Sequence, residues 1–61
     1  MANLTEKELS ALEDLLSLEE ANVKKYNMLT SHVQDTALQQ KLQNISNTHQ
    51  QHFNTLFNHL N

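Results

Sequence analysis

The chain has 61 residues and contains no glycine, no proline and no cysteine. Without cysteine, disulfides, thiolate zinc sites and iron–sulfur clusters are excluded, so any metal must be held by histidine and carboxylate. Seven acidic and four basic residues give a net charge of −3, a balance that predicts no nucleic-acid partner. Because turns depend on glycine and proline, the composition predicts long helices in a single domain of residues 1–61.

Hydrophobic residues make up 38% of the chain, but they stand singly or in pairs. No stretch approaches the roughly 20 apolar residues that a membrane-spanning helix needs, so we predict no membrane span. The segment Met1–Glu8 lacks the basic start and the apolar centre of a signal peptide. We therefore expect an intracellular protein.

The first half of the chain predicts one helix, from about residue 5 to residue 33. Thr5 and Glu8 have the spacing of a capping box, in which each side chain accepts a hydrogen bond from the other residue's backbone N–H. Apolar residues then recur at steps of three and four, the period of an amphipathic helix. This stripe consists of Leu9, Leu12, Leu16, Val23, Tyr26, Thr30 and Val33.

Glu19 interrupts the stripe near its centre, whereas Glu20 lies at its edge. Additional apolar residues widen the stripe on one flank, and this extra width predicts a second helix neighbour, as in a bundle. The flank consists of Ala11, Leu15, Leu18 and Leu29.

A polar cluster at residues 31–36 marks the predicted turn, and Asp35 is a suitable N-cap for a second helix that extends to about residue 60. Since neither glycine nor proline enforces this turn, one continuous helix is the alternative. The second helix carries a single apolar face that is interrupted by two histidines. This face consists of Leu38, Leu42, Ile45, His49, His52, Leu56 and Leu60.

An antiparallel hairpin with a turn centred between residues 34 and 35 pairs positions whose numbers sum to about 69 or 70. Val23 then lies opposite Ser46 or Asn47, and Glu19 lies level with His49 and His52. By the same geometry Tyr26 lies about two turns nearer the loop than Glu19, so we expect it to be an ordinary core aromatic.

Two interpretations of Glu19, His49 and His52 remain open. They form either a metal centre for a divalent transition metal (Zn, Fe, Cu or Ni) or a buried hydrogen-bonded polar layer that fixes the helix register. Burying an unpaired carboxylate destabilises the fold by several kcal/mol. If the predicted register is right, Glu19 must therefore either bind a metal or accept hydrogen bonds from the histidines. We expect His32 and His59 to be surface residues.

The size of the chain predicts a second copy as partner. Ordering 61 residues costs roughly 90 kcal/mol at about 1.5 kcal/mol per residue, and one layer of two helices can bury only one stripe. The predicted fold is therefore an all-α, two-helix antiparallel hairpin that dimerises into a four-helix bundle. A plain helical interaction module would have the same architecture.

Five stretches carry a resemblance to a known family. They are residues 4–9 (LTEKEL), 17–19 (SLE), 23–26 (VKKY), 35–41 (DTALQQK) and 49–56 (HQQHFNTL). Together they resemble the short spore coat proteins of the Coat F family, which are ferritin-like. The resemblance covers nearly the whole chain and rests on spacing and a few polar identities.

The resemblance implies that this chain is half of a ferritin-like four-helix bundle, completed by a second copy. Di-iron members of that class use a Glu on one helix and Glu-x-x-His on the next. Glu19 matches the first and His52 the histidine, but His49 stands where the family has the second Glu. An imidazole does not bridge two irons as a carboxylate does, so the site suits Zn, Cu, Ni or mononuclear Fe better.

The function that the resemblance implies is that of a small structural protein of the spore coat, with other coat proteins as further partners. A metal-binding or di-iron-type redox protein is the alternative, and an oxidase or catalase-like activity is the least favoured because the site has few carboxylates. No Ser-His-Asp arrangement has a credible geometry in this chain.

Overall fold

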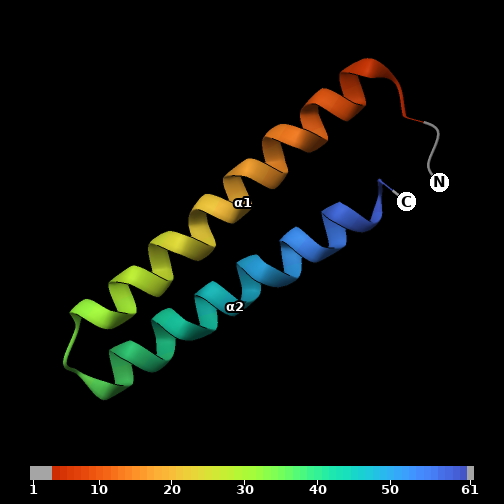
Figure 1. Ribbon diagram of the computed structural model, residues 1–61. Coiled ribbons are helices and arrows are strands. Elements are labelled where there is room, and N and C mark those ends of the chain that lie inside the picture. Colours follow the sequence, from red (N-terminus) through yellow and green to blue (C-terminus); the bar gives the residue numbers. More distant parts are fainter. Residues whose placement is uncertain (1–3, 61) are drawn as a thin grey trace.

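The computed structural model describes residues 4–60. The predictions of a domain over residues 1–61 and of no signal peptide in residues 1–8 therefore lie partly outside the described residues. The chain forms two helices, α1 (Glu6–His32) and α2 (Thr36–Asn58). They run antiparallel, so the first residues of α1 and the last residues of α2 lie together at the end opposite the loop (Figure 1). The predicted all-α hairpin is confirmed, and the alternative of one continuous helix is wrong.

Side-chain caps explain where both helices begin. The Thr5 hydroxyl accepts a hydrogen bond from the Glu8 backbone N–H, and the Thr5 N–H donates to Glu8 Oε1, both at 3.1 Å. These reciprocal bonds are the predicted capping box. At α2, the Asp35 carboxylate accepts from the Leu38 N–H at 2.8 Å, as expected of an N-cap.

The chain reverses direction without glycine because the loop needs no left-handed backbone. Val33 and Asp35 both have extended backbone angles, and within residues 4–60 no residue has a positive φ. The Gln39 side chain donates to the Val33 carbonyl oxygen at 2.6 Å, which satisfies an acceptor at the end of α1. Three residues between the helices therefore suffice for the turn.

A polar contact between α1 and α2, on the loop side of Glu19, shows the register of the two helices. The Ser46 hydroxyl donates to Asn27 Oδ1 at 2.7 Å and lies 3.3 Å from the Val23 carbonyl oxygen. This pairing of residues 23 and 46 confirms the predicted register. Ser46 is only 2% exposed, and its small side chain allows α1 and α2 to approach closely.

Much of the apolar surface has no partner within the hairpin. Among the described residues Leu12 is the one buried hydrophobic residue, and several large hydrophobic residues are exposed. They are Leu9, Leu15, Leu18, Met28, Leu38, Ile45 and Phe57. The extents of 46 × 14 × 10 Å describe a thin rod that is one helix layer deep. Within the described residues, no helix has the length and apolar character needed to span a membrane.

Candidate metal centre

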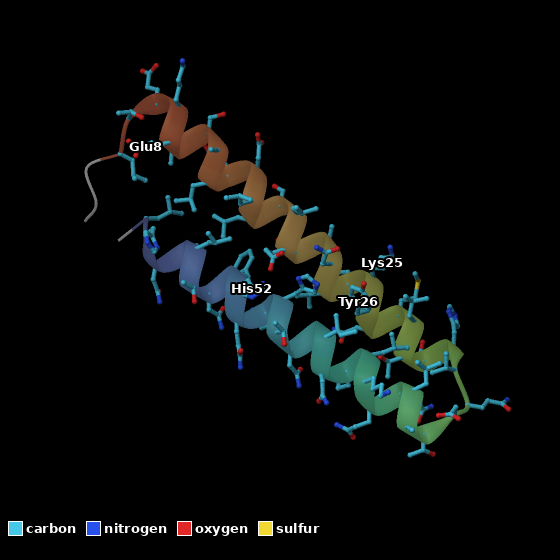
Figure 2. The ribbon with its side chains drawn as sticks, turned by 180° about the vertical axis from the view of Figure 1, so that it is seen from behind. Glu8, Lys25, Tyr26 and His52 are labelled. Carbon is cyan, nitrogen blue, oxygen red and sulfur yellow. The ribbon has the colours of Figure 1, made fainter. Side chains whose placement is uncertain are left out.

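Each of the three predicted ligands is positioned by one of the helices. Glu19 is the central residue of α1, with thirteen helix residues on either side of it between Glu6 and His32. His49 and His52 are three residues apart on α2 and therefore lie on the same side of that helix. The hairpin brings all three together, as the register predicted, and Figure 2 shows His52 at the seam between α1 and α2.

The Glu19 carboxylate is the centre of the cluster. Its two oxygens both lie 3.2 Å from His49 Nδ1, and Oε2 lies 2.9 Å from His52 Nδ1. The two imidazole rings meet edge to face, with centroids 5.8 Å apart. The Glu19 side chain is 11% exposed and the His49 side chain 22%. The Glu19 carboxylate, which interrupts the apolar stripe of α1, is therefore hydrogen-bonded by two imidazoles and is not an unpaired buried charge.

Electrostatics fix the protonation of the cluster. Partial burial acts to raise the pKa of the Glu19 carboxyl, but hydrogen bonds from His49 and His52 and their positive charge outweigh burial, so the pKa lies below its ordinary value. An ionised carboxylate only accepts hydrogen bonds, so both imidazoles donate to it from Nδ1.

The structure places Tyr26 closer to this cluster than the sequence predicted. Its ring, labelled in Figure 2, stacks on that of His49, and ring centroids 5.6 Å apart with planes at 14° to each other describe this contact. The prediction counted backbone turns, but side chains on a helix tilt toward its N-terminus. In antiparallel helices Tyr26 therefore tilts toward Glu19 while His49 tilts toward the loop, and the two rings meet.

The expected burial of His52 is also wrong. Its side chain is 58% exposed, because only two helices are present and one side of the seam is open. The other candidates lie outside the cluster, as expected. Glu20 pairs with Lys24 at 3.0 Å on the surface, His32 is exposed beside the loop, and His59 Nδ1 donates to the Thr55 carbonyl oxygen.

The three side chains could together hold a metal ion. One ligand atom from each of Glu19, His49 and His52 lies within 4.8 Å of the other two. A zinc ion bound at about 2.0 to 2.1 Å from each ligand atom would replace the hydrogen bonds of 2.9 and 3.2 Å between Glu19 and the two imidazoles. The donor set of two imidazoles and one carboxylate is that of many catalytic zinc sites, which keep a fourth position open.

Comparison of the chain with protein-family models, curated proteins and solved structures gives no match. The likeness to the Coat F family therefore rests on the residues quoted above. The chemistry of the cluster has to carry the functional argument.

A cavity of about 350 Å³ adjoins the cluster on its open side. It is lined by Leu15, Glu19, His52, Thr55 and Leu56. The walls are therefore mostly apolar, with the carboxylate and the exposed imidazole at one end. A second cavity of about 280 Å³ lies elsewhere, at Glu20, Val23, Lys24, Gln50 and Phe53.

Sequence reasoning missed the Asn27–Ser46 contact as a second polar layer. The register calculation did place Ser46 opposite Val23, and a small residue at that point was the available signal. Asn27 gave none, because it lies at the edge of the α1 stripe, where asparagine is common. The hairpin thus has two polar layers, and the one at Glu19 contains titratable groups.

The lowered pKa of Glu19 predicts acid sensitivity. In the unfolded chain the Glu19 carboxyl takes up a proton at its ordinary pKa of about 4.5, whereas in the folded chain it takes up the proton at a lower pH. The contribution of Glu19 to the free energy of unfolding is therefore fully present above pH 4.5 and is lost as the pH falls through the lowered pKa. Glu8, whose pKa is lowered by its capping bonds to Thr5, acts in the same window. Circular dichroism can follow the thermal midpoint from pH 7 to pH 3. The midpoint temperature should decrease once the pH is below about 4.5.

In the same titration a Glu19→Gln variant should lose less of its midpoint on acidification than the wild type. Glu13→Gln, which removes an exposed carboxylate of α1, is the matched control and should follow the wild type. Parallel curves for wild type and Glu19→Gln would show that the carboxylate and the imidazoles are not coupled in solution.

Proposed function

We propose that this chain is a small self-associating structural protein whose bundle core binds a divalent transition metal through Glu19, His49 and His52. Zinc is a cation commonly bound by two imidazoles and one carboxylate, the donor set of this cluster. The single observation that carries the proposal is the convergence of three ligand atoms from two helices within 4.8 Å.

The protonation of the cluster supports metal binding. The Glu19 carboxyl has a lowered pKa, which favours the ionised form that binds a cation, and each imidazole in its neutral form offers one nitrogen lone pair. Affinity should fall in acid, because protonated imidazole cannot bind a metal. Carboxylate-bridged di-iron chemistry is less well supported, since one chain supplies a single carboxylate to the cluster.

Self-association is supported by the unpartnered apolar surface. Several large hydrophobic side chains of the described residues are exposed, among them Leu15, Leu18 and Ile45. An exposed apolar surface of this kind is typical of a site of protein–protein contact. A homodimer that forms a four-helix bundle would cover it.

The biological setting that we propose is the spore coat, where the chain would assemble with itself and with other coat proteins. This part of the proposal rests on the sequence resemblance to the Coat F family. A short, glycine-free hairpin with an apolar flank suits a role in packing, which needs a self-complementary surface more than a substrate pocket.

The test of metal binding is a thermal titration of untagged protein with zinc. At a free zinc concentration about 100 times the Kd, binding adds about 2.7 kcal/mol of stability, which should raise the midpoint of a domain of this size by about 20 °C. A chelator should reverse the shift.

Two controls sharpen this test. Magnesium, which prefers oxygen ligands, should leave the midpoint unchanged. A His32→Asn, His59→Asn variant removes the two histidines outside the cluster and should respond to zinc like the wild type. If no first-row divalent metal shifts the midpoint, the cluster is a polar layer that fixes register, and the chain is a plain helical interaction module.

A further inference from the structure

The second cavity, of about 280 Å³, lies outside the candidate metal centre. It is lined by Glu20, Val23, Lys24, Gln50 and Phe53. None of these residues lines the cavity beside the cluster, so the two cavities are separate sites. Pockets for drug-sized ligands measure about 300 to 1,000 Å³. The second cavity therefore has room for a smaller molecule, and the proposed metal binding makes no use of it.

One wall of the second cavity carries two opposite charges side by side. Lys24 Nζ lies 3.0 Å from Glu20 Oε1, and the two residues are four apart on α1. Their side chains are 76% and 57% exposed, and an ion pair that is open to water in this way contributes little to the stability of a fold. The second carboxylate oxygen of Glu20 and two N–H groups of Lys24 remain available to a ligand.

The rest of the cavity offers apolar surface and an amide. Val23 and Phe53 are half-buried residues of the seam, and the Phe53 ring stacks on that of Phe57 with centroids 6.0 Å apart. This stacking restrains the ring that faces a ligand. Gln50 Nε2 donates to Asn54 Oδ1 at 3.1 Å, so the Gln50 Oε1 atom is free to accept a hydrogen bond from a ligand.

This combination of groups selects the chemical class of the ligand. A simple amine would bring its positive charge near Lys24, and a simple carboxylate would bring its negative charge near Glu20. A molecule that carries both charges can pair with both residues. Because the charged atoms of Lys24 and Glu20 are only 3.0 Å apart, the two charges of the ligand must also be close together.

An α-amino acid meets this requirement, since a single carbon atom joins its ammonium and carboxylate groups. We propose that the second cavity binds a free α-amino acid with an apolar side chain of about the size of leucine. The ligand ammonium group donates to the carboxylate of Glu20 and to Gln50 Oε1. The ligand carboxylate accepts from Lys24 Nζ, and the apolar side chain packs on Phe53.

The test is a titration of isotope-labelled protein with leucine, followed by two-dimensional nuclear magnetic resonance in the presence of a chelator. The backbone amide signals of Val23, Lys24 and Gln50 report on the cavity. Four further probes each lack one feature of leucine. Isopentylamine lacks the carboxylate, isocaproate lacks the ammonium group, glycine lacks the side chain, and aminocaproate has its two charges far apart.

We expect leucine to shift these amide signals with a saturating curve and each of the four probes to bind at least about fivefold more weakly. Glu20→Gln and Lys24→Met should each weaken leucine binding by about threefold. The matched controls are Glu13→Gln and Lys25→Met, which change exposed residues of the same types outside the cavity and should bind leucine like the wild type. Circular dichroism checks that all variants keep their helices.

Three results would overturn the proposal. They are shifts that do not saturate with leucine, isopentylamine or isocaproate binding as tightly as leucine, and equal loss of binding in the control variants.

The outcome is independent of the metal, because the chelator is present throughout. A chain that binds leucine but shows no zinc response would lose the proposed metal function and keep this inference. A chain that binds zinc but not leucine would lose this inference alone.

Discussion

A Glu19→Leu, His49→Leu double variant is expected to lose metal binding and yet remain folded. Removing two of three ligands should lower zinc affinity by more than about 100-fold, since each ligand of a structural zinc contributes about 3 kcal/mol. The apolar replacements fill the same position in the seam, and replacing a buried polar layer in this way is often neutral or stabilising. Thermal midpoints with and without zinc measure both effects.

The control for this variant is Glu20→Leu, His32→Leu, which removes one carboxylate and one histidine outside the cluster. It should keep the zinc-induced rise in midpoint. Collapse of the helical signal in the Glu19→Leu, His49→Leu variant would contradict the expectation and would show that the polar cluster is needed for folding itself.

Replacing Ser46 with leucine is expected to be the most destabilising single change in the seam. Ser46 is 2% exposed and lies 3.3 Å from the Val23 carbonyl oxygen, so there is no room for a larger side chain. Overpacking of this kind costs about 1 to 3 kcal/mol, and the Asn27 side chain also loses its hydrogen-bond donor. The thermal midpoint should fall by about 10 to 20 °C.

Thr48→Leu is the matched control for Ser46→Leu, because Thr48 is an exposed hydroxyl residue two positions along the same helix. Its midpoint should stay near that of the wild type. If Ser46→Leu were equally neutral, the helices would not approach each other at Ser46 as closely as described here.

The sequence was sufficient for the hairpin, its caps and its register. Thr5 and Asp35 signal helix starts through local hydrogen bonds, and the position of the turn then fixes which residues lie opposite each other. This simple geometry brought Glu19 to the level of His49 and His52. These features depend only on neighbouring residues and on one chain reversal, so a periodic sequence suffices to predict them.

Features that depend on side-chain direction or on a missing partner could not be obtained in this way. The stacking of Tyr26 on His49 arises from the tilt of both side chains, which a count of helical turns ignores. The exposure of His52 depends on how many helices surround the seam. Periodicity showed that an apolar flank exists, but it does not show what covers that flank.

The stacking of Tyr26 on His49 also gives the protein an internal optical probe. Tyr26 is the only tyrosine in the chain, which has no tryptophan, so light absorbed by tyrosine but not by phenylalanine excites this one ring. Because that ring lies against a candidate ligand, Cu²⁺ bound at His49 would quench its emission, whereas Zn²⁺, with a filled d shell, would leave it largely intact. Steady-state fluorescence can therefore follow occupancy of the centre without any added label.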